Sequence, residues 1–179
     1  DQNAAPSSFH EIMPGADGKK NVGKVISDNY EVVEGSWPKN KNEVVLVLDE
    51  NNSLSLTTVY ELGLKSASEY HDMMNQLNSG DDVKTDTKKI DYSDVIDRTL
   101  KLLPACDQYV KGDNGHWTYV GDDVDQINAL IDSDKAIDLK IVGVVKPVED
   151  ADATPLSSGV GYTRALTNEL IDRAESSEI

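Results

Sequence analysis

The clearest group of residues whose types and spacing could do chemistry begins at Gly18. Residues 18–25 read Gly-Lys-Lys-Asn-Val-Gly-Lys-Val, which matches a phosphate-binding P-loop as far as its lysine. The next position should be Ser or Thr, whose hydroxyl holds magnesium, but it is Val25. A P-loop also follows a buried strand and opens a helix, whereas the sequence before Gly18 is rich in Pro and Gly and the sequence after it is predicted to be extended. We therefore predict no nucleotide site and no cofactor.

The histidines and grouped acids also fall short of metal-binding patterns. His10 and Glu11 begin like the helix of a zinc protease, but Pro14 stands where the second histidine is needed. One acidic group is spaced roughly like calcium ligands, but it lacks the central glycine and the final glutamate of an EF-hand loop. Its members are Asp132, Asp134 and Asp138. A solvated acidic helix end is the favoured interpretation, so we predict no metal site.

Nothing in the sequence points to a nucleophile with its base. There is no Gly-x-Ser-x-Gly elbow. The single cysteine, Cys106, follows apolar residues and is predicted to be an inert buried thiol that forms no intramolecular disulfide. Residues 159–162, Gly-Val-Gly-Tyr, are interpreted as a tight turn before a helix. We therefore predict no catalytic residues, and an enzyme with an acid–base pair in a cleft ranks third among the candidate functions.

Three aromatic residues are the candidates for contact with a ligand or a partner: Trp37, Trp117 and Tyr119. Trp37 precedes a proline in a predicted turn, where partial exposure would suit such a contact. Packing over the edge of a sheet is the favoured alternative for Trp37, because aromatic side chains mostly bury area.

The charge of the chain excludes several classes of partner. The 179 residues include 17 Lys and Arg against 33 Asp and Glu, which gives a net charge of −16. Nucleic acid and anionic lipid headgroups are expected to be repelled, while basic ligands are permitted. The favoured explanation of the acidity is solubility. No apolar run reaches the roughly 18 residues of a membrane span, so any membrane anchor is expected to lie outside this sequence.

The elements that must position these residues are read from hydrophobic periodicity and turn signals. Residues 1–21 are predicted to be irregular. Strands are predicted at 24–33, with a break at 27–29, and at 43–48, 99–103 and 137–145. A hairpin is predicted from 108–110 and 116–120 around the Asp-Asn-Gly turn at 113–115.

Helices are predicted near 56–62, 67–77, 121–131 and 163–174. The third is expected to bury Val124, Ile127, Leu130 and Ile131, and the last to bury Leu166, Leu170 and Ile171. Residues 78–89 are predicted to be a mobile loop and 148–158 a second loop. The mixture of elements, without strict alternation of strand and helix, favours an α+β fold in which helices pack against a mixed sheet in one or two lobes.

Two stretches of the chain resemble a known family. Residues 30–49 contain Gly-Ser-Trp-Pro followed by Asn-Glu-Val-Val-Leu, and residues 60–64 end in Leu-Gly-Leu. Residues 139–147 read Leu-Lys-Ile-Val-Gly-Val-Val-Lys-Pro, and a glycine–tyrosine segment follows at 159–163. Both stretches resemble segments of the extracytoplasmic domain of bacterial ABC transporter permeases of the MacB/FtsX type, and they occur in the same order.

The resemblance implies that residues 1–179 are a single extracytoplasmic domain, or part of one, with a MacB-like core. The parent would be an integral protein of the cell membrane that works with a separate cytoplasmic ATPase and a possible second permease copy. The domain would be non-catalytic and would couple the motion of membrane helices to substrate export or to regulation of a partner. The alternative is a secreted or surface module that binds a cationic peptide in an acidic pocket lined by Trp37, Trp117 or Tyr119.

Overall fold

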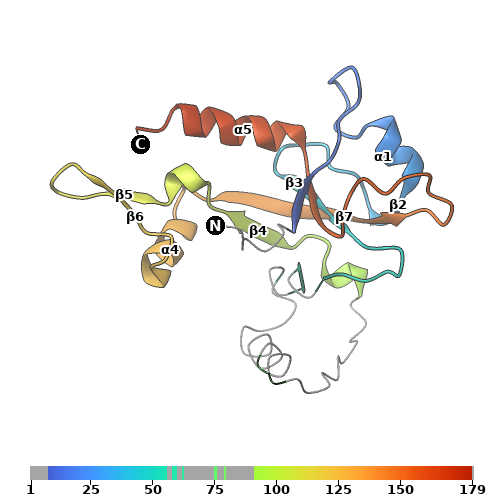
Figure 1. The fold of residues 1–179 in the computed structure, drawn as a ribbon, viewed down its shortest axis with the longest axis horizontal. Coiled ribbons are helices and arrows are strands. Elements are labelled where there is room, and N and C mark those ends of the chain that lie inside the picture. Colours follow the sequence, from blue (N-terminus) through green and yellow to red (C-terminus); the bar gives the residue numbers. More distant parts are fainter. Residues whose placement is uncertain are drawn as a thin grey trace.

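The chain folds as an α+β domain around one mixed sheet (Figure 1). The computed structural model describes residues 8–55 and 91–178, together with residues 58, 59, 62, 75 and 79. In these residues the main sheet has six strands in the order β1-β8-β3-β7-β2, and β4 also pairs with β7. These strands are β1 (Phe9–Glu11), β2 (Tyr30–Gly35), β3 (Glu43–Val47), β4 (Thr99–Leu102), β7 (Ile137–Pro147) and β8 (Gly159–Tyr162).

The remaining described elements are three α-helices, two short 3-10 helices and a separate two-stranded sheet. The α-helices are α1 (Lys24–Asn29), α4 (Val124–Ile131) and α5 (Arg164–Glu175). The 3-10 helices are η1 (Tyr92–Asp94) and η2 (Ala105–Asp107), and the small sheet pairs β5 (Tyr109–Lys111) with β6 (Trp117–Tyr119). The predicted fold class, strand and helix packed as α+β, is confirmed at this level.

Strand β7 is the axis of the main sheet. It runs parallel to β3 on one side, and on the other side it pairs antiparallel with β2 and, further toward its start, with β4. Residues 43–48 and 137–145 were predicted as strands because they are rich in β-branched residues, and both predictions are confirmed. Because β3 is covered by strands at both edges and by side chains on both faces, its apolar run is continuous.

The side chains of β3 alternate between two hydrophobic clusters on opposite faces of the sheet. Val44 and Leu46 belong to the cluster that includes Leu166 of α5. Val45 and Val47 belong to the cluster that includes Ile26 of α1. Helices α5 and α1 therefore cover opposite faces.

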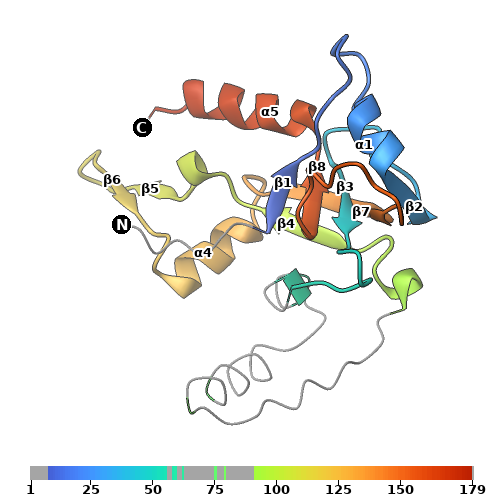
Figure 2. The same ribbon diagram turned by 45° about the vertical axis from the view of Figure 1, so that its right-hand side comes forward.

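The prediction of a strand at residues 24–26, before a break at 27–29, is wrong, because residues 24–29 form helix α1 (Figure 2). Val25 and Ile26 favour a strand intrinsically, but only Ile26 is needed in the core, and it is fully buried there. The end of α1 is held by Asn29, whose carbonyl and side-chain oxygens accept hydrogen bonds from Val148 and Ala153 at 3.0 and 3.2 Å. Tertiary packing overrides strand propensity at this short helix.

Two short strands also replace predicted irregular structure. Residues 9–11 lie within the segment predicted to be irregular, yet they form β1, which pairs parallel with β8. Residues 159–162 form β8 rather than a tight turn. A Cβ on Gly161 would lie 3.1 Å from side-chain atoms of Ile12 and of Val45, so the glycine lets these side chains pack closely on the strand.

The other elements agree with prediction except in how deeply the apolar side chains of the helices are buried. Strand β4, the hairpin and helices α4 and α5 occur as expected. Within the helices, Val124 is 72 % exposed and Ile171 is 50 % exposed, so the prediction that both lie inside is wrong. The helices predicted at 56–62 and 67–77 and the loop at 78–89 lie almost entirely outside the described residues.

Gly35 at the end of β2 offers a test of the contact between β2 and β7. Its φ of +71° suits glycine, and a Cβ there would overlap the carbonyl oxygen of Val142. Gly35→Ala should therefore lower the free energy of unfolding by more than about 2 kcal/mol in urea denaturation. Gly18→Ala is the matched control, since its φ is +66° and no atom lies within 4 Å, so it should cost only about 1 kcal/mol. Equal losses in the two variants would contradict this account.

Candidate partner-binding surface

Hairpin β5–β6 and helix α4 lie together at one end of the molecule, away from α1 (Figures 1 and 2). We call residues 109–131 the hairpin–helix unit. Its turn has Gly115 at φ +76°, and the amide of His116 donates to the side chain of Asn114 at 3.1 Å. The Asn-Gly pair that predicted this hairpin supplies the positive φ that a tight turn needs.

The hairpin–helix unit is attached to the rest of the fold at a few points. Val120 is buried, and its amide donates to the carbonyl of Gln108 at 3.0 Å. Lys111 on β5 forms an ion pair of 3.2 Å with Glu178, which follows α5. Helix α4 itself contains no buried residue, although the prediction placed four of its apolar side chains inside. The apolar side of α4 is therefore only partly covered by the rest of the domain.

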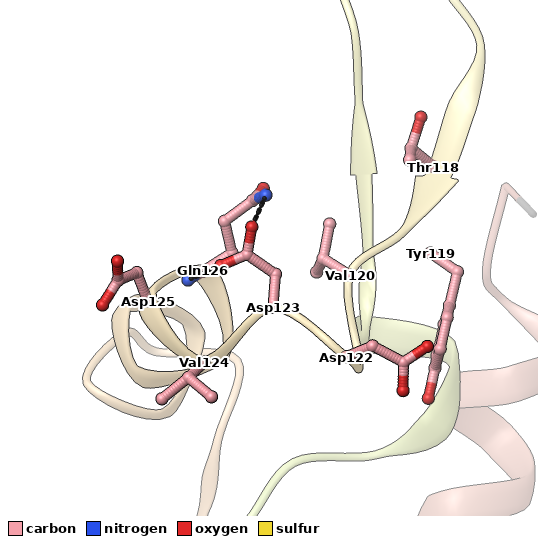
Figure 3. A pocket seen from close by; sticks show the side chains of 8 residues that line it. All are labelled: Thr118, Tyr119, Val120, Asp122, Asp123, Val124, Asp125 and Gln126. Carbon is pink, nitrogen blue, oxygen red and sulfur yellow. Dashed lines mark hydrogen bonds between the residues drawn. The ribbon is translucent and has the colours of Figure 1, made fainter.

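A shallow depression of about 500 Å³ lies where β6 meets α4 (Figure 3). Its apolar lining includes Tyr119, which is 51 % exposed, and Val124. The complete lining is Thr118, Tyr119, Val120, Asp122, Asp123, Val124, Asp125 and Gln126. Exposed apolar groups beside several carboxylates are suited to a ligand that is itself both apolar and basic.

Gly121 allows the ring of Tyr119 to fold over the backbone at this point. A Cβ on residue 121 would overlap the hydroxyl end of the Tyr119 ring. The phenol therefore lies across Gly121, and its ring also packs at a tilt against Tyr109, with 5.4 Å between ring centroids. An exposed aromatic that is held on two sides is pre-organised for contact with another molecule.

The three acids of the depression have different roles. Asp123 caps α4: its carboxylate accepts hydrogen bonds from the side chain of Gln126 at 2.8 Å and from the Gln126 amide at 3.0 Å. These two bonds, the side-chain bond first, lower the pKa of Asp123 below its ordinary value. Because Asp123 is already engaged, Asp122 and Asp125 are the carboxylates left to meet a basic ligand.

The structure brings two of the three predicted contact residues onto one element. Tyr119 lines the depression, whereas Trp117 lies on the same strand, half-buried, with the Lys111 ammonium 5.3 Å from its ring centroid. Trp37 is elsewhere: it is half-buried and packs against the core cluster that contains Ile26, in agreement with the favoured packing interpretation. Sequence reasoning missed Val124 as a surface residue, because its helical spacing from Ile127 and Ile131 placed it on the predicted buried face.

The other chemical candidates remain scattered. Residues 18–23 form a loop, and Lys24 and Val25 begin α1, so the prediction of an extended segment after Gly18 is wrong. His10 and Glu11 lie on strand β1, and Cys106 in η2 is half-buried rather than buried. Across the described ranges, no three His, Cys, Asp or Glu side chains are grouped as a metal site.

Comparison of the chain with protein-family models, with curated proteins and with solved structures found no match. None of the helices within residues 8–55 and 91–178 has the length and apolarity that crossing a bilayer requires.

The cap on α4 can be tested by substitution of Asp123. Asp123→Ala should speed hydrogen exchange at the Gln126 amide, because that amide loses its acceptor. Asp123→Ser is the matched control, since a serine hydroxyl also accepts at this position. In the unaltered protein the same amide should lose protection only at acid pH, as the lowered pKa of Asp123 is passed. Unchanged exchange in the alanine variant would show that the cap does not hold the helix.

Proposed function

We propose that this chain is the extracytoplasmic domain of a membrane permease of the MacB/FtsX type. In this role it catalyses no reaction. It takes part in the movement that a separate cytoplasmic ATPase drives through the membrane helices of the parent protein, and it passes that movement to a substrate or a partner. A second copy of the permease would lie beside it.

One observation carries the proposal: the stretches that resemble the family form one continuous part of the sheet. The first stretch supplies β2 and β3, and the second supplies β7 and β8, about 100 residues later in the chain. These four strands are neighbours in the order β8-β3-β7-β2. If both segments resemble the same family of domains because they build its core, they are expected to lie together in one core, as these four strands do.

Details of packing within the stretches support the same interpretation. Gly35 of the first stretch is the register partner of Gly143 in the second, next to an irregularity between Val32 and Glu34. A Cβ on Gly143 would overlap the carbonyl oxygen of Ser36. The glycines of both resembling stretches are thus required by one backbone contact, which gives a physical reason for the two motifs to occur together.

The compartment can be tested by labelling a new cysteine in the full-length protein in its own membrane. Asp113→Cys, made with Cys106→Ser, places one thiol at the exposed hairpin turn. A membrane-impermeant maleimide should label it in intact cells, in protein that stays in the membrane pellet after alkaline washing. Cys106→Ser alone sets the background. Labelling that requires lysis of the cells would overturn the proposal, and labelled protein free in the medium would favour a secreted module.

A second candidate function is favoured by the depression between β6 and α4. An acidic surface with an exposed tyrosine suits a cationic peptide, which could place basic side chains near Asp122 and Asp125 and an apolar side chain against Tyr119. The function would then be ligand binding by a surface module. It is also compatible with a permease domain whose partner carries such a peptide segment.

Calorimetric titration with short peptides that mix lysine or arginine with aromatic residues tests this second candidate. Asp122→Asn with Asp125→Asn should weaken binding about fivefold, as expected for two exposed charge pairs. Asp150→Asn with Asp152→Asn removes the same charge from a loop outside the hairpin–helix unit and should leave affinity nearly unchanged. Absence of binding across the panel, or equal losses in both double variants, would count against a peptide site here.

A further inference from the structure

The loop between β1 and α1 joins exposed apolar side chains to a local excess of positive charge. It is the blue loop that projects beyond the rest of the fold in Figures 1 and 2. Met13 at its start is 48 % exposed, and Val25, just after its end, is 49 % exposed. The amide of Gly23 donates to the carbonyl of Met13 at 2.7 Å, so the two ends of the loop lie side by side.

The positive charge comes from this loop and from the neighbouring β2–β3 connection. The two segments, residues 13–25 and 36–42, contain five lysines and one aspartate, in a chain whose net charge is −16. Asn21 joins them, because its side-chain nitrogen donates to the carbonyl oxygen of Lys39 at 2.7 Å. We call Met13, Val25 and the five lysines the basic tip; the lysines are Lys19, Lys20, Lys24, Lys39 and Lys41.

Part of the charge of the basic tip is already engaged, since the Glu43 carboxylate lies against Lys39 and accepts from its amide at 2.6 Å. Lys24 pairs with Asp28, and Lys41 pairs with Glu169. Within the described part of the chain, the ammonium groups of Lys19 and Lys20 form no ion pair and are exposed. The one aspartate of the loop, Asp17, is turned toward its own backbone, where it accepts from the Lys19 amide at 3.1 Å.

The loop also has a defined shape. The Gly15 amide donates to the carbonyl of Lys20, and the Gly18 amide donates to the carbonyl of Gly15, both at 2.9 Å. Gly23 packs so closely that a Cβ would lie 2.6 Å from the carbonyl oxygen of Pro14. A surface held in this way presents its groups without first losing conformational entropy on binding.

From this combination we infer that the basic tip rests on an anionic lipid bilayer. Lysines beside half-exposed apolar side chains are the composition that attaches protein surfaces to the headgroup region, with the ammonium groups at the lipid phosphates and the apolar groups inserted below them. A soluble polyanion would use the lysines but would have no use for Met13 and Val25. The apolar pair therefore decides in favour of a bilayer.

The acidity of the whole chain does not prevent this contact. At 0.1 M salt, charges on the surface are screened over about 10 Å. A bilayer that touches the projecting tip therefore interacts with the charges of the tip and hardly with the net charge of the whole chain. The rest of the chain is acidic on balance, which favours an approach to an anionic surface through the basic tip. The inference holds whether or not the parent protein is a permease.

Fluorescence of a dye at the loop tests the contact in the full 179-residue chain. Ala16→Cys, with Cys106→Ser, carries a polarity-sensitive dye at the exposed turn. Vesicles of equal parts phosphatidylglycerol and phosphatidylcholine should shift its emission to the blue, and vesicles of phosphatidylcholine alone should not. The same dye on Asp113→Cys, at the hairpin turn, should not respond to either.

Two double variants separate the charge from the apolar contact. Lys19→Glu with Lys20→Glu should lower the apparent affinity for the anionic vesicles roughly thirtyfold or more, given the usual contribution of each lysine at such a surface. Met13→Ser with Val25→Ser should lower it several-fold without changing the thermal midpoint, because both side chains are already half in water. No shift with anionic vesicles would overturn the inference. The inference would also be overturned if soluble polyphosphate gave the same emission shift as the anionic vesicles and the Met13→Ser, Val25→Ser variant kept that shift.

Discussion

The pairing of β7 with three other strands is the constraint on which the rest of this structure depends. Along its length β7 pairs with β3 on one side and with β2 and β4 on the other. Its side chains enter both hydrophobic clusters, through Ile141 on one face and Val145 on the other. Helices α5 and α1 are held against this sheet by the buried side chains of Leu166 and Ile26. The basic tip and the hairpin–helix unit lie at opposite ends of the fold that this sheet organises.

The sequence predicts the elements whose own residues decide their structure. The apolar runs of β3 and β7 can only be buried as strands, and the Asp-Asn-Gly turn determines the hairpin before any packing is considered. Prediction from the sequence fails where contacts with a distant segment of the chain determine the local structure. Residues 24–29 form a helix because Ile26 is buried in the core and Asn29 accepts a hydrogen bond from Ala153. Strand β1 forms because it can pair with the edge of β8. Such three- to six-residue elements carry too little periodicity to be recognised alone.

The candidate surfaces could be predicted only in part, because the composition of the chain does not say which residues meet on the folded surface. Tyr119 was identified as an aromatic with a possible partner role, and it lies in the depression. Val124 was predicted to be buried because of its helical spacing, but in the fold no residue of α4 is fully buried. The net charge predicts repulsion of anions by the chain as a whole, whereas the fold joins the loop that carries Lys19 and Lys20 to the segment that carries Lys39. Charge segregation of this kind depends on which loops meet, which the sequence does not state.

The edges of the main sheet have a consequence for how copies of this chain tolerate crowding. One edge strand, β1, has three residues. At the other edge, β4 has four residues, and β2 is interrupted by its irregularity and carries Glu31 and Glu34. Short, bent or charged edges are poor templates for added strands. Neighbouring copies held at high density, as on a surface, would therefore meet through side chains and remain separate folded bodies instead of fusing their sheets into aggregates.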